Sequence, residues 1–244
     1  MNQTKTSCEL KMIAKEQLLG NYGKIICALL VAELIPSFIM FLAEDFAAKG
    51  TLINLLLYYV INFIVALLIG VFTLGTTKLY MNFSTGRPFA TSDIFYGFHG
   101  HQNIGILIAL VQAGIAFVSL IPFIISIVIW YLTKSAFLYP VIALTIIAGI
   151  VFAYVLLLTI SQSFYIAVDF PDYTIKQIFS MSRRIMKGHR ARLFYIHVSF
   201  IPLALLTLLS FGIGLLWLQP YMNNTLTHFY LDLMDFHTKS YQAN

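Results

Sequence analysis

Charged residues are scarce in this chain of 244 residues, because Asp, Glu, Lys and Arg together make up only 10% of it. An average soluble domain carries about 25%. Cysteine is scarcer still: Cys8 and Cys27 are too few for a disulfide framework, and we expect both to be free thiols. The chain also lacks the glycine period of collagen and the high polarity of a disordered protein. These deficits exclude the soluble, fibrous and disordered classes.

Apolar residues, in contrast, make up 59% of the chain, and they gather in long runs. Five runs approach or exceed the ~20 residues that a helix needs to cross a bilayer. They cover about residues 25–43, 52–76, 104–132, 136–165 and 193–218. The sequence therefore predicts an all-α fold, a polytopic transmembrane helical bundle of five spans with interfacial amphipathic helices.

The fourth run and the C-terminal tail leave the number of spans open. As a single helix, the uncharged stretch between Lys134 and Asp169 would measure about 51 Å, against a hydrocarbon core of about 30 Å. We expect one long helix there, and the alternative is a break near Gly149. The tail, residues 219–244, has amphipathic helical spacing and is expected to lie on the outer surface. A sixth, partial span is the alternative, and it would bring the C-terminus inside.

Lys and Arg are distributed unevenly between the predicted loops, which indicates how the chain is oriented. With the N-terminus in the cytosol, twelve of them lie inside: Lys5, Lys11, Lys15, Lys24, Lys78, Arg87, Lys176, Arg183, Arg184, Lys187, Arg190 and Arg192. Three lie outside: Lys49, Lys134 and Lys239. We therefore expect a cytosolic leader at residues 1–23, a first span retained as an anchor, and a C-terminus outside after five crossings. Orientation also explains the net charge of +5, so no nucleic-acid partner is expected.

Residues 174–188 are expected to form a basic amphipathic helix on the cytosolic side. Thr174 and Gln177 have capping-box spacing, and Gly188 stands where a helix would end. The apolar residues of this segment fall on one stripe, which is typical of a helix lying in the membrane interface. The residues expected to contact anionic lipid headgroups are Lys176, Arg183, Arg184, Lys187, Arg190 and Arg192. The alternative is that these charges only fix the orientation.

A glycine precedes three of the predicted spans on the cytosolic side: Gly20, Gly100 and Gly188. Each follows a short surface segment. Glycine permits the left-handed turn that would redirect such a segment into the membrane. The pattern suggests a weak internal repetition of surface segment, glycine and span. Coincidence is the alternative, since glycine is common at helix ends.

The most distinctive motif is the run 182–189, with the sequence SRRIMKGH, followed by Leu-Phe at 193–194 and Ser-Phe-Ile at 199–201. This motif resembles the signature of a membrane family catalogued as domain of unknown function number 975. The pairs at 202–203 (Pro-Leu) and 148–149 (Ala-Gly) depart from the family pattern, in which Gly-Trp and Pro-Gly are usual. The resemblance implies a multi-pass protein of the bacterial plasma membrane without an established activity. It also implies a distant similarity to the membrane portion of some glycerophosphodiester phosphodiesterases.

Glu33 carries the one charge inside a predicted span, near the middle of the first. A carboxylate there costs about 2.5 kcal/mol or more on insertion. One interpretation is a group that binds a proton, a cation or a ligand; the other is a structural hydrogen bond to Asn62, Gln112 or a tyrosine. Pro36 would free a backbone carbonyl nearby. We treat Glu33, Asn62 and Gln112 as a candidate intramembrane polar site.

Known catalytic and metal-binding patterns are missing from the sequence. It contains no His-Glu-x-x-His, no Gly-x-Ser-x-Gly, no Walker loop and no dinucleotide fingerprint. Its histidines have no cysteine or carboxylate at ligand spacing, so no catalytic residue, metal or cofactor is predicted. We expect a non-enzymatic membrane protein that handles or senses a lipid or small amphiphile, or that supports a membrane complex with unidentified protein partners. The alternative is a secondary transporter or channel that uses Glu33 as an intramembrane ion or proton site.

Overall fold

The structure, a computed structural model, describes residues 4–48 and 50–242, and most of them are helical. The α-helices are α1 (Ser7–Leu18), α2 (Tyr22–Ala48), α3 (Leu52–Ser84), α4 (Gln102–Thr133), α5 (Tyr139–Thr159), α6 (Ser163–Asp169), α7 (Ile175–Ile185), α8 (Arg190–Val198), α9 (Ile201–Leu209) and α10 (Leu215–Gln242). Two 3-10 helices, η1 (Thr91–Phe98) and η2 (Ala136–Leu138), lie between them. The described residues form no β-strand, in agreement with the predicted all-α fold.

Five helical segments are long and apolar enough to cross a membrane: Tyr22–Phe46, Leu52–Ser84, Gln102–Thr133, Ala136–Asp169 and Arg190–Leu209. Each overlaps one of the five predicted runs. The prediction of a polytopic helical membrane protein with five candidate spans is therefore confirmed.

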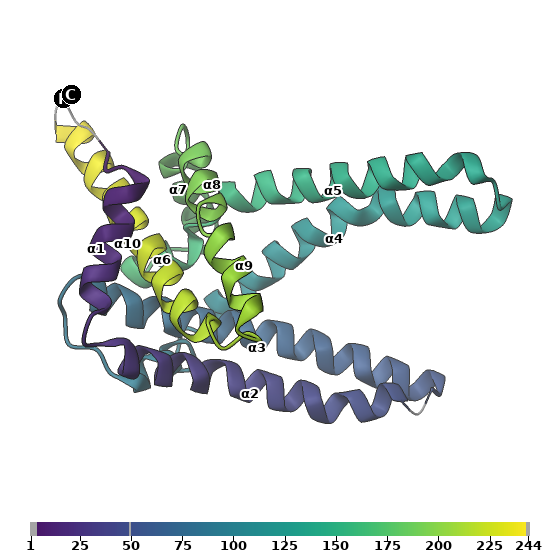
Figure 1. Ribbon diagram of the computed structural model, residues 1–244, viewed down its shortest axis with the longest axis horizontal. Coiled ribbons are helices and arrows are strands. Elements are labelled where there is room, and N and C mark those ends of the chain that lie inside the picture. The colour runs from purple at the N-terminus through teal and green to yellow at the C-terminus, as the bar shows by residue number, and fades with distance from the viewer. Residues whose placement is uncertain (1–3, 49, 243–244) are drawn as a thin grey trace.

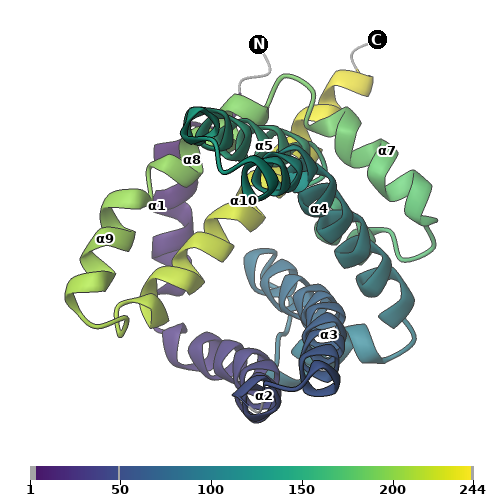
Figure 2. The ribbon, with the colours of Figure 1, turned by 90° about the vertical axis from the view of Figure 1, so that its right-hand side faces the viewer.

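Four of the long helices form two arms that project from one end of the molecule (Figure 1). In the first arm α2 packs against α3, and in the second α4 packs against α5. Figure 2 looks along the arms, and it shows α1, α8 and α9 running across them. We call α1 and α6 to α10, together with η1, the base. The base lies across the root of both arms.

Large apolar side chains cover the arms and leave few charges on them. Phe41, Leu132 and Leu144, one from each of three arm helices, are 69%, 75% and 68% exposed. Contiguous apolar surface of this extent is rare on soluble proteins and is normal for helices surrounded by lipid. The fully buried residues lie in the base and at the roots of the arms: Leu10 of α1, Phe229 of α10 and Ile25 of α2 have no exposed surface.

The fourth apolar run is helical through Gly149, as predicted, and it ends at Thr159. Gly149 is a packing position: a Cβ there would lie 2.5 Å from the carbonyl oxygen of Ser119 on α4. The chain then turns at residues 160–162, and α6 follows as a separate short helix in the base. The helix in this run is thus shorter than the uncharged stretch suggests. The length of α5, with 21 residues, is close to the thickness of a hydrocarbon core, about 30 Å.

The fifth apolar run differs from the single helix expected over residues 193–218. Helix α8 ends at Val198, because Pro202 has no N–H to donate to the Val198 carbonyl. Helix α9 ends at Leu209, and the chain reverses through Gly212, which has a φ of +86°. The last residues of the run therefore belong to α10.

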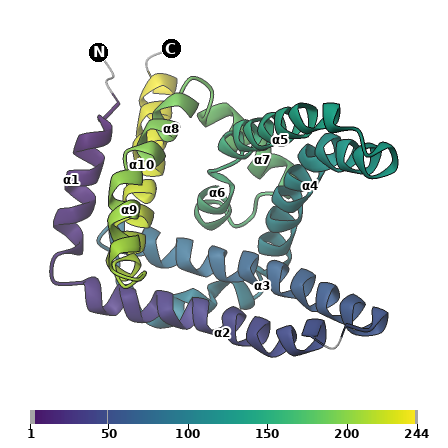
Figure 3. The same ribbon diagram turned by 45° about the vertical axis from the view of Figure 1, so that its right-hand side comes forward.

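Helix α10 contains the tail and packs on α1, so both ends of the described chain lie side by side (Figure 3). The backbone N–H of Lys5 donates to Asp232 Oδ1 at 3.2 Å. Residues in hydrogen-bond contact cannot lie on opposite sides of a membrane, so the expectation of a C-terminus opposite the N-terminus is wrong. The tail is amphipathic, as expected, but its apolar face is covered by the base, since Phe229, Tyr230 and Leu233 are fully buried.

The three glycines before the predicted spans share one backbone conformation. Gly20, Gly100 and Gly188 have φ values of +82°, +87° and +85°. Each joins a short helix to the next helix: α1 to α2, η1 to α4, and α7 to α8. The predicted left-handed turns are therefore present at all three places.

Candidate functional site

Glu33 lies on α2 and meets a side chain that the sequence had not grouped with it. Gln219 Nε2 of α10 donates a hydrogen bond to Glu33 Oε1. Gln219 stands one turn into α10, which reaches the arm from the base. The Glu33 side chain is otherwise exposed, so the pair leaves the second carboxylate oxygen accessible.

A half-open cavity of about 390 Å³ lies beside this pair, between α2, α3 and α10. We call it the Glu33 cavity. Its polar lining residues are Glu33, Ser37, Thr73, Thr76, Gln219 and Asn223. Its apolar walls include Leu29, Ile69 and Phe72. A cavity with one carboxylate, two amides and several hydroxyls has the features of a binding site for a small polar group.

The backbone adds an acceptor to the same wall. Pro36 lies inside α2 and has no N–H, so the carbonyl of Ala32 loses its helical hydrogen-bond partner. Both residues line the cavity. On α3, the Thr73 hydroxyl donates to the Ile69 carbonyl at 2.8 Å, which satisfies its own proton and leaves its oxygen as an acceptor. The cavity is therefore rich in acceptors, and its donors are the amide groups of Gln219 and Asn223 and the Ser37 hydroxyl.

The structure does not bring the other two predicted polar residues to Glu33. Asn62 Nδ2 donates to the Tyr58 carbonyl at 2.9 Å, within its own helix, and Asn62 does not line the Glu33 cavity. Gln112 lies on α4, in the other arm, and does not line it either. The partners that sequence reasoning missed are Gln219 and Asn223, an i,i+4 pair of amides on one face of α10.

The basic helix is α7, and its N-terminal cap is as predicted. The backbone N–H and the hydroxyl of Thr174 both donate to Gln177 Oε1 at 2.8 Å. Its apolar stripe, however, faces the protein, because Ile178 and Ile185 are buried in the core of the base. Amphipathic spacing indicates only that one face of a helix is covered by apolar material. In α7 the covering elements are α6 and α10. The exposed basic side chains are Lys176, Arg183, Arg184, Lys187 and Arg190.

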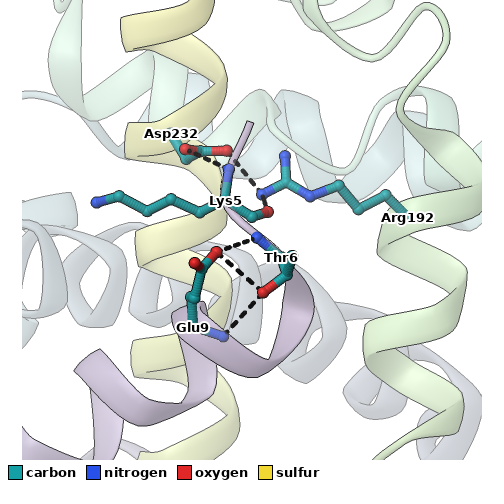
Figure 4. Close-up of polar contacts among 5 residues, drawn as sticks. All are labelled: Lys5, Thr6, Glu9, Arg192 and Asp232. Carbon is teal, nitrogen blue, oxygen red and sulfur yellow. Dashed lines mark hydrogen bonds and ion pairs between the residues drawn. The ribbon is translucent and has the colours of Figure 1, made fainter. Parts of the chain in front are cut away.

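Arg192, the sixth predicted headgroup contact, is engaged within the base (Figure 4). Its Nη2 lies 2.6 Å from Asp232 Oδ2 of α10 and also donates to the Lys5 carbonyl. Beside it, Thr6 and Glu9 form the capping box that begins α1, with the Thr6 N–H donating to Glu9 Oε2 at 2.6 Å. Arg192 thus joins the N-terminal segment, α8 and α10 at one point.

Polar side chains also hold α10 against α1 along their length. Asn224 Nδ2 donates to the Ala14 carbonyl at 3.1 Å, and His228 Nε2 donates to Gln17 Oε1 at 2.7 Å. Burial lowers the pKa of His228 to about 4, and the charge of Lys5 acts in the same direction. His228 is therefore neutral at physiological pH.

The cysteines and the other possible metal ligands form no site in the part of the chain that the structure describes. Cys8 and Cys27 are free thiols, as predicted, and the structure places both at the surface. Within residues 4–48 and 50–242, no three His, Cys, Asp or Glu side chains come together as metal ligands would. The strongest polar constellation near the membrane-embedded part is therefore the Glu33 cavity.

A family model described as "Protein of unknown function (DUF975)" matches residues 1–236. No curated protein and no solved structure matches the chain significantly.

Proposed function

From the premise that this chain belongs to the DUF975 family of proteins of unknown function, we propose that it is a non-enzymatic protein that binds a lipid or small amphiphile at the Glu33 cavity. The observation that carries the proposal is an accessible carboxylate in the wall of a half-open cavity, on a helix whose outer surface is apolar. The amphiphile's polar group would occupy the cavity, and its chain would lie along the arm.

The chemistry of the cavity selects the headgroup. Glu33 is the only charged residue of α2 between Lys24 and Glu44. A carboxylate is costly at this position, and a cationic group that enters the cavity would offset that cost. The surrounding acceptors also favour a headgroup that carries hydrogen-bond donors. A headgroup with an ammonium group therefore fits best, and one with hydroxyls alone fits less well.

The flank of the cavity suits an acyl chain. Leu34, Phe38 and Phe41 follow one another on α2 at helical spacing, and their side chains are 61%, 62% and 69% exposed. They continue from Glu33 towards the tip of the first arm. A headgroup held at Glu33 would therefore place its chain on an apolar stripe in contact with lipid.

The distribution of charge supports a cytosolic base, and the family resemblance given above implies the plasma membrane of a bacterium. Among the residues that the structure describes, Lys134 is the one Lys or Arg at the far end of an arm, and all the others lie in the base or at the roots of the arms. Lys49 lies outside the described residues. Because α10 returns to α1, Lys239 joins the basic side, which strengthens the positive-inside bias beyond the sequence count. The exposed cations of α7 would then face anionic headgroups of the cytosolic leaflet.

The test is cross-linking of the full chain, in nanodiscs, to a photoactivatable phosphatidylethanolamine, whose headgroup carries an ammonium. Glu33→Gln keeps the size and the hydrogen bond of the side chain but removes its charge. We expect cross-linking to the α2 segment to fall at least tenfold, equivalent to about 1.4 kcal/mol. Glu44→Gln, the same change in an exposed residue near the arm tip, is the matched control and should cross-link like the wild type. Equal cross-linking of the Glu33→Gln variant would refute the proposal.

A secondary transporter is the second candidate, because a carboxylate that opens on a cavity could also bind and release a proton. It predicts that purified protein in proteoliposomes dissipates an imposed pH gradient, and that Glu33→Gln abolishes this activity. If neither the wild type nor Glu33→Gln dissipates the pH gradient, and lipid cross-linking depends on the charge of Glu33, the amphiphile-binding function is favoured.

A further inference from the structure

The segment formed by α8 and α9, Arg190–Leu209, has the length and composition of a membrane span, yet it runs across the four arm helices (Figures 1 and 2). Each of its two helices has 9 residues, a length of about 13 Å. Neither alone reaches half of a hydrocarbon core of about 30 Å. Its contacts decide at which depth it lies.

A lysine of the amphipathic N-terminal helix binds the middle of this segment. Lys11 Nζ of α1 donates to the Ser199 carbonyl at 3.0 Å and lies 4.0 Å from the centre of the Phe200 ring. Ser199 and Phe200 are the break between α8 and α9. If the segment crossed the bilayer, its midpoint would carry this ammonium, and α1 with it, to the centre of the membrane. α1 also contains Glu9, Lys15 and Glu16, all exposed, so that placement is prohibitively costly.

The first end of the segment is fixed at the same level. Arg192, near the start of α8, pairs with Asp232 of α10 and with the Lys5 carbonyl. These partners belong to the two chain ends, which lie together. The start and the middle of the segment therefore both lie in the base, and its far end is the part that can extend beyond the base into lipid.

That far end is apolar and exposed. Leu208, Leu209, Phe211 and Ile213 are 71%, 78%, 97% and 61% exposed around the turn into α10. Trp217, at the start of α10, is 51% exposed, and tryptophan is enriched at the membrane–water interface. An exposed apolar turn that is continuous with lipid-covered arms is most simply covered by the same lipid.

The backbone N–H groups of the turn donate within the turn, as backbone donors placed in lipid must. The Gly212 N–H donates to the Thr207 carbonyl at 2.9 Å, and the Phe211 N–H donates to the Leu208 carbonyl at 3.1 Å. The Gly214 N–H donates to the Ser210 hydroxyl oxygen, also at 2.9 Å. Few polar groups of the reversal are left for water.

We propose that residues 208–217, which we call the wedge, insert into the acyl-chain region of the leaflet on the base side and return without crossing the bilayer. Only the four arm helices then cross. This even number agrees with the contact between Lys5 and Asp232, which requires both chain ends on one side. The partner of the wedge is the hydrocarbon of that leaflet, and Lys15, which lines a cavity of about 470 Å³ between α1, α9 and α10 with Trp217, stands at the height of its headgroups.

The test uses single cysteines in the full chain, in a Cys8→Ser, Cys27→Ser background. Phe211→Cys reports on the wedge, Lys134→Cys on the tip of the second arm, and Lys239→Cys on the base. In sealed vesicles, a membrane-impermeant maleimide should label Lys134→Cys from one side and Lys239→Cys only from the other. It should label Phe211→Cys from neither side until detergent is added. Because Phe211 is 97% exposed, its replacement removes no packing inside the protein.

Depth is measured with a bimane fluorophore on the cysteine of the Phe211→Cys variant. Lipids brominated near the carbonyl end of the acyl chain should quench it more than lipids brominated near the methyl end. Labelling of Phe211→Cys together with Lys134→Cys would show a fifth crossing and overturn the proposal. Labelling together with Lys239→Cys would place the turn in water and overturn it as well. An inverted protein would exchange the two reference labels without exposing Phe211→Cys, so the wedge is tested independently of the orientation and of the Glu33 cavity.

Discussion

Arg192 and Asp232 form an ion pair between α8 and α10, with only 15% and 7% of their side-chain surfaces exposed. The same aspartate accepts a hydrogen bond from the Lys5 backbone, so one carboxylate connects three segments that are far apart in the sequence. Figure 4 shows Asp232 and Arg192 on opposite sides of the backbone of the N-terminal segment. This pair holds the base in the arrangement that brings both chain ends together.

Removing the Asp232 carboxylate should destabilise the base. In Asp232→Ala, the Arg192 guanidinium remains in a largely buried position without its counter-charge, which typically costs about 3–5 kcal/mol. We expect a clear fall in the thermal unfolding midpoint of the protein in detergent. The neighbouring pair of Asp235 and Lys239 is exposed, 60% and 55%, and provides the control. Asp235→Ala should cost about 0–1 kcal/mol. Equal effects of the two variants would contradict the role assigned to the Arg192–Asp232 pair.

Acidification should loosen the contact between α1 and α10 through His228. Burial places the pKa of His228 at about 4 in the folded protein, below its ordinary value of 6.5. The unfolded chain therefore binds a proton at a higher pH than the folded one, so the stabilisation is complete above about pH 6.5 and is lost as the pH falls towards 4. The expected loss is up to about 1.4 kcal/mol per pH unit within this window.

The measurement compares unfolding midpoints at about pH 7.5 and about pH 5. His228→Gln keeps a donor for Gln17 but does not titrate, so its midpoint should depend less on pH than that of the wild type. His99, an exposed residue that directly follows η1, provides the control, and His99→Gln should keep the wild-type pH dependence. If His228→Gln keeps the full dependence as well, the loss of stability arises from other groups.

The arms were predictable because hydropathy is a local property. Each arm helix contains a long apolar run with at most one charge, and Gly20 and Gly100 mark where the chain turns into α2 and α4. The base was less predictable, because its apolar runs are short and its partners are distant. The break before α9 has a local signal in Pro202, but the total hydropathy of residues 193–218 hides it.

The candidate site was only half predictable for the same reason. Glu33 stands out in the sequence, because a charge inside an apolar helix is rare. Its partner, Gln219, lies 186 residues away, in a tail whose amphipathic pattern does not show what covers it. Asn62 and Gln112 are the two amides that the sequence places inside spans. Their positions along the chain do not determine which helices pack against each other, and so do not determine which amide lies near Glu33.

Close packing at the root of the first arm should make Gly75 intolerant of a side chain. A Cβ there would lie 1.8 Å from the Ile94 carbonyl oxygen, so η1 would have to move away from α3. Overpacking of this kind typically costs about 1–3 kcal/mol. We expect Gly75→Ala to lower the thermal unfolding midpoint.

Gly114, in the middle of α4, provides the control, because it has no atom within 4 Å of the corresponding Cβ position. Gly114→Ala should therefore leave the midpoint unchanged or raise it slightly, because alanine favours the helix. Similar losses in both variants would argue against the contact between η1 and α3.

The basic face of α7 should make the stability of the protein depend on anionic lipid. Near such a surface each exposed cation contributes about 1 kcal/mol, and salt screens this contribution. In nanodiscs at low salt, the unfolding midpoint should be higher in phosphatidylglycerol than in phosphatidylcholine. In Lys176→Gln, Arg183→Gln, Arg184→Gln, Lys187→Gln, this difference should fall by at least half, and high salt should remove the rest. Lys134→Gln, a change at the far end of the second arm, should keep the full difference. If the variant with four substitutions also keeps the full difference between the two lipids, the cations of α7 act only in fixing the orientation of the chain. That is the other role that their positions allow.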